Sequence, residues 1–416
     1  MGMKAKPFVI PKRQVMQAYR LVRANAGAAG VDHQSLGDFE KDLKNNLYRL
    51  WNRMSSGSYF PPPVKSVAIP KKAGGERILG VPTVADRVAQ AVVKLQIEPD
   101  IEPYFLKDSY GYRPGKSALD AVGVTRKRCW RYDWVLEFDI RGLFDNIPHA
   151  LILRALRKHV DCKWALLYVE RWLKAPLQQP DGCLVARDQG TPQGGVVSPL
   201  LSNLFLHYVF DTWMKKRFPG VSWCRYADDG LLHCHSLRQA RELHRALEER
   251  FRECGLELHP QKTKIVYCKD SNRCADYPVT SFDFLGYAFR GRASKNAKGE
   301  LFVSFSPAVS NGALKSMRAL VRKSNLRNRV DRSIEDIAQK FNPVLRGWIY
   351  YYGRFNRSAL YPFLRYFNHA LRAWVMNKHK RFRGKRTRAG QYLERMARSQ
   401  PDLFAHWRYR MTGVFA

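Results

Sequence analysis

The chain of 416 residues is 45% hydrophobic, which is enough for a large core divided among two or three domains. Its 72 lysines and arginines outnumber 36 aspartates and glutamates, and few soluble proteins carry a net charge of +36 unless they bind a polyanion. The sequence lacks a run of about 18 apolar residues, which excludes a membrane-spanning helix. Its eight cysteines form no Cys-x-x-Cys pair, so we expect reduced thiols rather than structural zinc.

The N-terminal region is expected to be helical. Residues 11–25 suit one helix, and residues 38–54 suit a second, because apolar side chains recur there at a spacing of three and four. Three consecutive prolines at 61–63 end the helical region and begin an extended segment. Residues 1–60 are therefore assigned to a helical N-terminal extension.

A basic hairpin is predicted next. Residues 64–69 alternate like a strand and lead into a Gly74-Gly75 turn with basic residues on both arms. Lys71 and Arg77 belong to opposite arms, and two cations across a hairpin can grip a triphosphate. A charged hairpin that only faces solvent is an equally open alternative at this point.

A strand that ends in a carboxylate is expected at residues 134–140. Its apolar residues Leu136, Phe138 and Ile140 share one face, whereas Asp139 lies on the other. An aspartate at the end of an apolar strand costs free energy unless a metal ion or an arginine compensates it.

A glycine-rich turn at residues 190–195 is predicted to precede another helix. Ser198 suits the N-cap of that helix, and Pro199 suits its first helical position.

Two adjacent carboxylates, Asp228 and Asp229, lie between apolar runs. Asp229-Gly230 is a strong signal for a tight hairpin, because such a turn needs a residue that tolerates positive φ; we predict strand, turn and strand with both acids at the tip. Like charges about 4 Å apart repel by roughly 4 kcal/mol at an effective dielectric of about 20, so a chain that keeps them together usually supplies a cation. Taken alone, the motif favours a solvated turn over a functional site.

A helix and a further hairpin are predicted after the acidic pair. The helix spans residues 236–254. Residues 256–259 and 263–267 are then expected to pair with each other, with Lys262 and Lys264 at their bend.

The remainder of the chain is predicted to begin with strands and to end with helices. Residues 282–289 and 301–305 are expected to pair across a polar, basic loop. From Val309 onward the pattern is helical, with Pro343 and Gly353 as breaks.

The last third of the chain is the most basic part. Residues 291–416 contain 27 basic and 6 acidic residues, interleaved with aromatic residues. Such a mixture suits neutralisation of a nucleic-acid backbone together with stacking on bases, although we expect most of the aromatic side chains to lie in the core. The basic residues expected to contact nucleic acid are Arg346, Lys378, Lys380, Arg381, Arg383, Lys385, Arg386 and Arg388.

The order of the motifs resembles that of a reverse transcriptase, and more narrowly of the bacterial group II intron-encoded reverse transcriptase/maturases of the endonuclease-lacking type. The resemblance covers about residues 25–410. The stretches that carry it are Phe138-Asp139-Ile140, Thr191-Pro192-Gln193-Gly194, Tyr226-Ala227-Asp228-Asp229, Ile69-Pro70-Lys71, Ser109-Tyr110-Gly111-Tyr112-Arg113-Pro114-Gly115, Ser198-Pro199-Leu200-Leu201-Ser202-Asn203, and the maturase-like run from Asn342 to Gly353.

The resemblance implies an α+β fold of the right-hand polymerase type, with fingers, palm and thumb. The palm would contain an antiparallel sheet. Residues 61–290 would form the fingers and palm, and residues 291–416 a basic helical thumb/maturase region with a cationic C-terminal tail.

The family pattern assigns Asp139, Asp228 and Asp229 as catalytic carboxylates. With the carbonyl of Ile140 they would hold two Mg²⁺ ions, for which Mn²⁺ is a possible substitute, bridging the primer 3′-OH and the incoming triphosphate.

The pattern also implies a nucleotide-binding set. Lys71 and Arg77 match fingers cations that contact the triphosphate, Phe144 matches the steric gate that excludes a 2′-OH, and Gln193 borders the nucleotide pocket. Lys262 and Lys264 match a primer-gripping element, for which a solvated turn is an equally open alternative.

The implied function is RNA-directed DNA synthesis, combined with binding of a group II intron RNA to assist splicing and retrotransposition. The implied partners are the intron RNA, an RNA template with a DNA primer, dNTPs and target DNA, in the bacterial cytoplasm and at the nucleoid. Two departures stand out, because many relatives have an aromatic residue where this chain has Gly230 and phenylalanine where it has Leu143. The alternatives are a splicing factor with a vestigial polymerase and a domesticated reverse transcriptase of a defence, CRISPR-associated or diversity-generating system.

Overall fold

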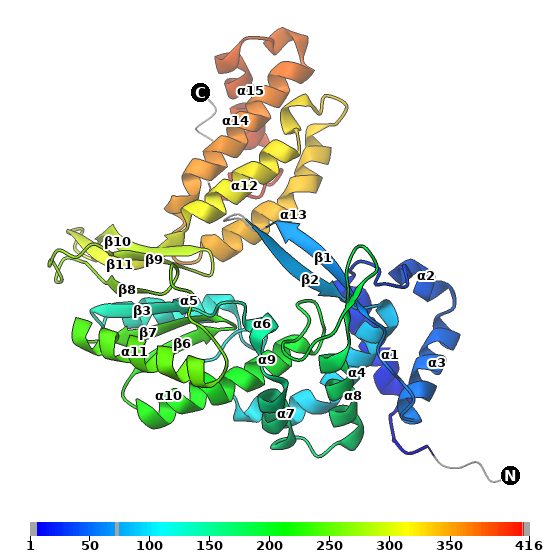
Figure 1. Ribbon diagram of the computed structural model, residues 1–416. Helices are drawn as coiled ribbons and strands as arrows, with labels where there is room; N and C mark the ends of the chain where they lie inside the picture. The colour runs from blue at the N-terminus through cyan, green and yellow to red at the C-terminus, as the bar shows by residue number, and fades with distance from the viewer. Residues whose placement is uncertain (1–5, 71–74, 410, 412–416) are drawn as a thin grey trace. The chain divides into compact units, whose positions relative to one another are not determined.

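The computed structural model describes residues 6–70, 75–409 and 411, which belong to two compact units (Figure 1). The first unit comprises the chain up to Ala121 together with Leu136–Lys264, and the second comprises Val122–Val135 together with the chain from Ile265. Of the helices in the described ranges, none combines the length and apolarity that crossing a bilayer would need.

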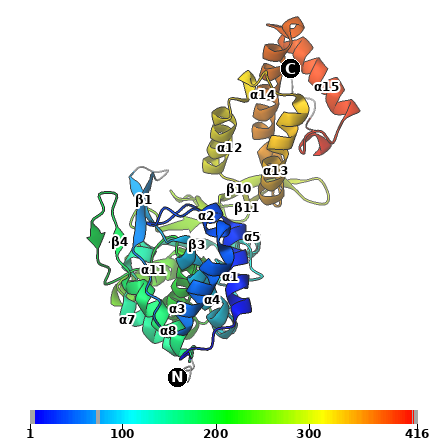
Figure 2. The same cartoon turned by 90° about the vertical axis from the view of Figure 1, so that its right-hand side faces the viewer.

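The first unit begins with three helices, α1 (Lys12–Asn25), α2 (Leu36–Lys41) and α3 (Leu43–Ser55). They pack around α4 (Val84–Ile101), as Figures 1 and 2 show. The single helix predicted at 38–54 is wrong in one respect, because Asp42 leaves the helical conformation with φ −128° and separates α2 from α3. A capping box between Ser35 and Asp38 starts α2 earlier than predicted.

A four-stranded sheet carries the predicted basic hairpin. Strand β1 (Val64–Pro70) pairs with β2 (Glu76–Val81) in antiparallel register, with Ile69 opposite Arg77. Strands β4 (Leu177–Gln178) and β5 (Leu184–Val185) extend the sheet in the order β2-β1-β4-β5. Lys71 and Gly74 of the predicted turn lie outside the described residues.

A second four-stranded sheet has the order β6-β7-β3-β8 and carries the acidic motifs. Its strands are β3 (Trp134–Asp139), β6 (Ser222–Tyr226), β7 (Asp229–Cys234) and β8 (Lys264–Tyr267). Beneath it in Figure 1 lie the helical segments α9 (Ser198–Leu206), the π-helical turn η2 (His207–Asp211) and α10 (Thr212–Arg217). Phe210 of η2 contacts Phe138 of β3 and Trp223 of β6, and α11 (Leu237–Glu253) contacts β7. The rings of Phe138, Phe210 and Phe251 meet in the core of this layer.

Two local predictions near this sheet are wrong. Residues 256–259 do not pair with β8; instead Leu258 bridges Ile140, and the His259 N–H donates to the Asp139 carbonyl at 2.8 Å. Ser198 does not cap α9, because Val197 occupies the N-cap and the Ser198 hydroxyl accepts a hydrogen bond from Thr191 at 2.7 Å. In both cases a tertiary partner replaces the local one.

Five further helical segments lie between residues 102 and 174, and residues 122–129 among them belong to the second unit. The segments are η1 (Glu102–Tyr104), α5 (Ala118–Cys129), α6 (Leu143–Asn146), α7 (His149–Arg157) and α8 (Lys163–Lys174).

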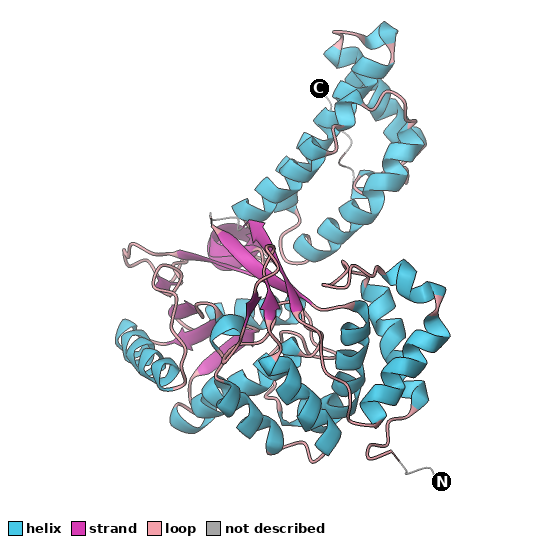
Figure 3. Cartoon of the chain, turned by 45° about the vertical axis from the view of Figure 1, so that its right-hand side comes forward, coloured by secondary structure: helices cyan, strands magenta, loops and turns pink. Residues whose placement is uncertain are grey.

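The second unit joins a three-stranded antiparallel sheet to a bundle of helices (Figure 3). The sheet has the order β11-β10-β9, built from β9 (Ser281–Phe284), β10 (Tyr287–Lys295) and β11 (Leu301–Val309). The predicted pairing of 282–289 with 301–305 is wrong, because residues 301–305 pair with 291–295 of β10. Residues 282–289 instead form a hairpin by themselves, with Leu285 and Gly286 both at positive φ.

The α-helices that follow β11 in the second unit are α12 (Asn311–Lys323), α13 (Ile334–Tyr352), α14 (Tyr361–Lys378) and α15 (Arg386–Ser399). Pro343 lies inside α13, so the break predicted there is wrong, whereas Gly353 does end this helix. Buried aromatic side chains fill the centre of the bundle, as expected for most of the aromatic residues in this region: Phe341, Phe363, Phe367, Trp374 and Trp407.

Candidate active site

The hairpin between β6 and β7 has a different turn from the one predicted. Tyr226 pairs with Asp229, so the two connecting residues are Ala227 and Asp228, and the positive φ of 56° belongs to Ala227. Asp229 already lies in β7. Both carboxylates therefore lie at the tip of the hairpin, as predicted. The turn itself is formed by Ala227 and Asp228, whereas the prediction placed it at Asp229 and Gly230.

Gly230 lies inside β7, opposite Arg225, and it is required by packing rather than by a turn. A Cβ atom at this position would come closer than 3.0 Å to three ring carbons of Phe138 on the neighbouring strand β3. Phe138 itself is 1% exposed. The aromatic ring beside the acidic pair is therefore supplied by β3, which gives a physical reason for the departure at Gly230.

The third carboxylate, Asp139, ends β3, which is the sheet neighbour of β7. Burial, followed by the negative charges of Asp228, Asp139 and Glu137, raises the pKa of Asp229 to about 7. Burial is also the main cause that raises the pKa of Asp228, with the charge of Asp139 adding to it. The three aspartates thus form one electrostatically coupled group.

Two lysines supply the positive charge that this group calls for. The Lys262 ammonium contacts Asp139 Oδ2 at 2.9 Å, and the Lys264 ammonium contacts Glu137 at 3.2 Å. Both lysines therefore border the acidic group. Their predicted contact with nucleic acid stays a prediction.

The chemistry of the donors suits a hard divalent cation, because carboxylate and carbonyl oxygens are the ligands that such ions prefer. Within the described ranges, however, no three His, Cys, Asp or Glu side chains converge closely enough to form a ready-made metal site. Ile140 follows β3 and is bridged to Leu258, and its predicted role as a carbonyl ligand is untested.

Two of the predicted nucleotide-binding residues, Phe144 and Gln193, line one hollow, and a third, Arg77, contacts Gln193. The Arg77 guanidinium donates to Gln193 Oε1 at 2.5 Å, and Gln193 Nε2 in turn donates to Asp145 at 3.2 Å. Phe144, Asp145 and Gln193 line a cavity of about 220 Å³ beside the turn at 190–193. The structure thus brings Arg77, Phe144 and Gln193 together, while Lys71 lies outside the described residues.

Sequence reasoning missed the residue that supports the acidic hairpin from below, Arg225. This guanidinium is fully buried and forms a two-pronged ion pair with the buried Asp211 of η2, at 2.8 and 2.7 Å. It also donates to Ser109 Oγ at 2.9 Å, Asn203 Oδ1 at 3.0 Å and the Ala227 carbonyl at 3.1 Å. All five N–H groups of the guanidinium are thereby used, the last of them on the turn itself.

The sequence did contain a signal for this network: Arg225 lies in an otherwise apolar strand. Such an arginine is expected to be buried, and a buried cation needs fixed acidic or polar partners.

The glycine-rich loop at 109–117 belongs to the same support. Gly111 lies so close to the hairpin that a Cβ there would come within 3.0 Å of the Ala227 main-chain nitrogen. The Gly111 carbonyl accepts from Asn203 Nδ2 at 2.6 Å, and Arg113 is anchored to Glu102 at 2.7 Å. These sequence motifs hold the site in place from beneath.

A sheet that carries two carboxylates on a hairpin and a third at the end of the adjacent strand, with a helical layer beneath, has the architecture of a nucleic-acid polymerase palm. Residues 69–289 match the family model described as reverse transcriptase (RNA-dependent DNA polymerase), and residues 314–393 match the maturase-specific domain of group II introns. The first match covers more than half of the chain, which therefore belongs to the reverse transcriptase family. Together the two matches confirm the predicted group II intron reverse transcriptase/maturase type and the α+β polymerase fold.

Curated relatives agree with these matches. The chain is 28% identical over 355 residues to Protein YkfC of Escherichia coli (strain K12), covering 74% of this chain and 88% of that protein. It is 33% identical over 208 residues to the group II intron-encoded protein LtrA of Lactococcus lactis subsp. cremoris, covering 48% of this chain but only 34% of LtrA.

A solved structure of telomerase from Candida albicans, in complex with a TWJ fragment of telomeric RNA, matches with a TM-score of 0.44 at 12% identity. The match covers 91% of this chain and 69% of the telomerase chain.

Proposed function

We propose that this protein copies RNA into DNA and also binds its group II intron RNA to assist splicing and retrotransposition. The observation that carries the polymerase proposal is the coupled group Asp139, Asp228 and Asp229, supported by the fully buried Arg225. The family match implies dependence on a divalent metal. The buried ion pair between Arg225 and Asp211 stabilises the acidic turn, and a polymerase that had lost its activity would have no need for this. This observation disfavours the alternative of a vestigial polymerase.

In this proposal the three aspartates and the Ile140 carbonyl would hold two Mg²⁺ ions. When bound, these ions lower the pKa of the primer 3′-OH and neutralise charge on the triphosphate. Because the pKa of Asp229 is about 7, this carboxyl group is partly protonated at neutral pH. A bound cation would lower that pKa, and the carboxyl group would then lose its proton. Lys262 balances part of the negative charge of Asp139.

The dNTP would lie against Arg77, Phe144 and Gln193. Arg77 would release Gln193 and turn to the triphosphate, for which a guanidinium is well suited, and Lys71 would assist it. The Phe144 ring would then occupy the space that a ribonucleotide 2′-OH needs.

The nucleic-acid partners follow from charge. An RNA template with its DNA primer and, during mobility, target DNA would lie along the basic surfaces, with Lys262 and Lys264 at the primer. The intron RNA would contact the basic second unit. Because its proposed partners are RNA and target DNA, the protein would work in the cytoplasm and at the nucleoid.

Primer extension tests the polymerase proposal. The wild-type protein with oligo(dT) on poly(rA), dTTP and Mg²⁺ should yield DNA, and Asp228→Asn should abolish the product while RNA affinity stays within about twofold of wild type. Absence of product from the wild type with either Mg²⁺ or Mn²⁺ would refute the proposal, and a parallel loss of RNA affinity in Asp228→Asn would show that the aspartates serve folding instead.

A further inference from the structure

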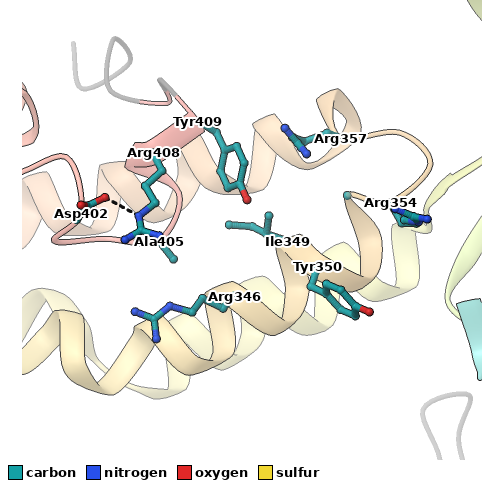
Figure 4. Close-up of a pocket in the computed structure, with 10 residues that line it drawn as sticks. Arg346, Ile349, Tyr350, Arg354, Arg357, Asp402, Ala405, Arg408 and Tyr409 are labelled. Atoms are coloured by element: carbon teal, nitrogen blue, oxygen red, sulfur yellow. Dashed lines mark hydrogen bonds and ion pairs between the residues drawn. The ribbon is translucent and has the colours of Figure 1, made fainter.

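A cavity of about 370 Å³ lies in the second unit, between the C-terminal half of α13 and residues 402–409 (Figure 4). Four arginines line it, from three separate parts of the chain: Arg346 on α13, Arg354 and Arg357 in the segment that follows, and Arg408 near the C-terminal end of the described chain. The size falls within the range of about 300–1,000 Å³ that is typical of pockets for small ligands.

The wall formed by residues 402–409 is held in place by buried side chains. Asn342 Nδ2 donates to the Leu403 carbonyl at 2.9 Å, and Asn342 Oδ1 accepts from the Ala405 N–H at 2.9 Å. Farther along, the fully buried His406 shares a hydrogen bond of 2.6 Å with Asn368. Asn342 opens the maturase-like motif, so this motif builds the cavity instead of merely facing solvent.

The charges around the cavity select an anion. Asp402 is the acidic residue in the lining, and it is paired with Arg408, as the dashed line in Figure 4 shows. Among the described residues, Arg346 and Arg354 have no acidic partner. Guanidinium groups bind phosphate with two parallel hydrogen bonds, and several of them around one hollow suit a phosphodiester better than a single carboxylate.

The aromatic side chains add a platform for a base. The Tyr350 side chain is 75% exposed at the rim of the cavity, although most aromatic side chains of this unit are buried. Tyr409 has a different role, because the guanidinium of Arg357 lies over its ring at 4.5 Å from the centroid. This cation–π contact fixes the position of the guanidinium. A phosphate site with an exposed aromatic ring beside it is the combination that binds unpaired nucleotides.

We propose that this cavity binds one unpaired nucleotide of a single-stranded RNA segment, with its phosphates on Arg346 and Arg354 and its base on Tyr350. The Asp402 carboxylate can only accept hydrogen bonds, and the ribose 2′-OH is a donor that DNA lacks, which favours RNA over DNA. The inference rests on the proposed binding of intron RNA and specifies where one unpaired nucleotide of such an RNA would be held.

The test uses full-length protein carrying Asp228→Asn, so that binding is measured without polymerisation. The probes are fluorescein-labelled (rU)12, (dT)12 and a 12-base-pair RNA duplex, and the readout is fluorescence anisotropy at several salt concentrations. Arg346→Gln/Arg354→Gln should weaken (rU)12 binding tenfold or more and reduce the slope of log K against log salt by about 1.4, because each lost phosphate contact on a single strand removes about 0.7.

Tyr350→Ala should weaken (rU)12 binding by roughly tenfold without changing the salt slope, whereas Tyr350→Phe should bind like wild type, because stacking needs only the ring. The matched control is Arg322→Gln/Arg395→Gln, which removes the same charge from α12 and α15 outside the cavity and should lower the affinity by less than threefold. Thermal unfolding of every variant verifies that the second unit remains folded.

Equal affinities of the cavity and control variants for (rU)12 would overturn the proposal. Equal losses for (rU)12 and (dT)12 would overturn the assignment to RNA, and equal losses for (rU)12 and the duplex would overturn the assignment to an unpaired nucleotide. If the wild type makes DNA in primer extension while the cavity variants keep full (rU)12 affinity, this inference fails and the polymerase function stands. If the wild type makes no DNA, the binding measurements still decide the inference.

Discussion

Replacing Gly230 with alanine tests whether the Phe138 ring sets the spacing of β3 and β7, the two strands that carry the proposed catalytic aspartates. The new methyl group would come within 3.0 Å of three ring carbons. Phe138 cannot yield easily, because its ring packs against Phe210 at 5.1 Å and Phe251 at 5.8 Å between centroids. Overpacking of this kind typically costs about 1–3 kcal/mol, so we expect the free energy of unfolding to fall by that amount.

Catalysis should suffer more than stability. Phe138 precedes Asp139, and Gly230 follows Asp229, so a shift that relieves the clash moves two carboxylates of the proposed active site relative to each other. A misplacement of about 1 Å can cost on the order of 100-fold in rate. We expect the rate of single dTTP incorporation at saturating substrate to fall between tenfold and 100-fold, with RNA affinity unchanged.

Phe138→Leu/Gly230→Ala provides the compensating change. Leucine leaves room for the methyl group, so the double variant should be more stable than the sum of the two single effects by about 1 kcal/mol or more, and it should regain part of the lost rate. Urea unfolding followed by circular dichroism gives the free energies. Wild-type stability and turnover in Gly230→Ala, or effects that add within about 0.5 kcal/mol, would refute the role assigned to the ring.

Three further predictions concern the support of the site, acid stability and RNA binding. Arg225→Met leaves Asp211 buried without its partner and should cost about 3–5 kcal/mol in urea unfolding, whereas Arg225→Met/Asp211→Leu should recover much of that loss; a double variant no more stable than the single one would contradict this. Burial lowers the pKa of His406 to about 3 from 6.5, so below pH 6.5 the unfolded chain binds a proton that the folded chain does not. Stability therefore falls as pH drops from 6.5 toward 3, by at most about 1.4 kcal/mol per pH unit for this group, and His406→Gln should lose less stability between pH 7 and 5.5 than wild type does in paired urea titrations. An equal loss in both proteins would mean that this histidine is not the source. Finally, neutralising several basic residues of the tail should reduce the slope of log K against log salt for RNA by about 0.7–0.9 per lost phosphate contact. The residues to neutralise are Arg381, Arg383, Lys385, Arg386 and Arg388. An unchanged slope would mean that the RNA binds elsewhere.

Much of the site could be predicted from the sequence because its signals are local. The alternation of residues 134–140 places Asp139 on the face opposite Phe138, and the apolar runs on either side of Asp228 and Asp229 predict two strands and a turn. The excess of basic residues marks a protein that binds a polyanion without any knowledge of its fold. Local alternation and composition need no distant partner, so they can be read along the chain.

Other features depended on residues far apart in sequence. The turn falls at Ala227 and Asp228 because Arg225, itself held by Asp211, donates to the Ala227 carbonyl. The local Asp-Gly preference was overridden by this buried network. Similarly, Leu258 bridges Ile140 across more than a hundred residues instead of pairing within its own predicted hairpin.

The sequence by itself determined which chemical groups this protein offers: three carboxylates in two strand motifs, basic residues on both arms of the hairpin at 64–79, and a basic C-terminal third. Only the tertiary structure decided how that chemistry is held. The sequence alone does not explain why Gly230 replaces the aromatic residue of many relatives. In the folded sheet, the Phe138 ring of β3 occupies the space that a side chain at position 230 would need. The physical reason is that close packing is set by neighbours across a sheet, and a glycine shows its purpose only when the side chain that fills its place is known.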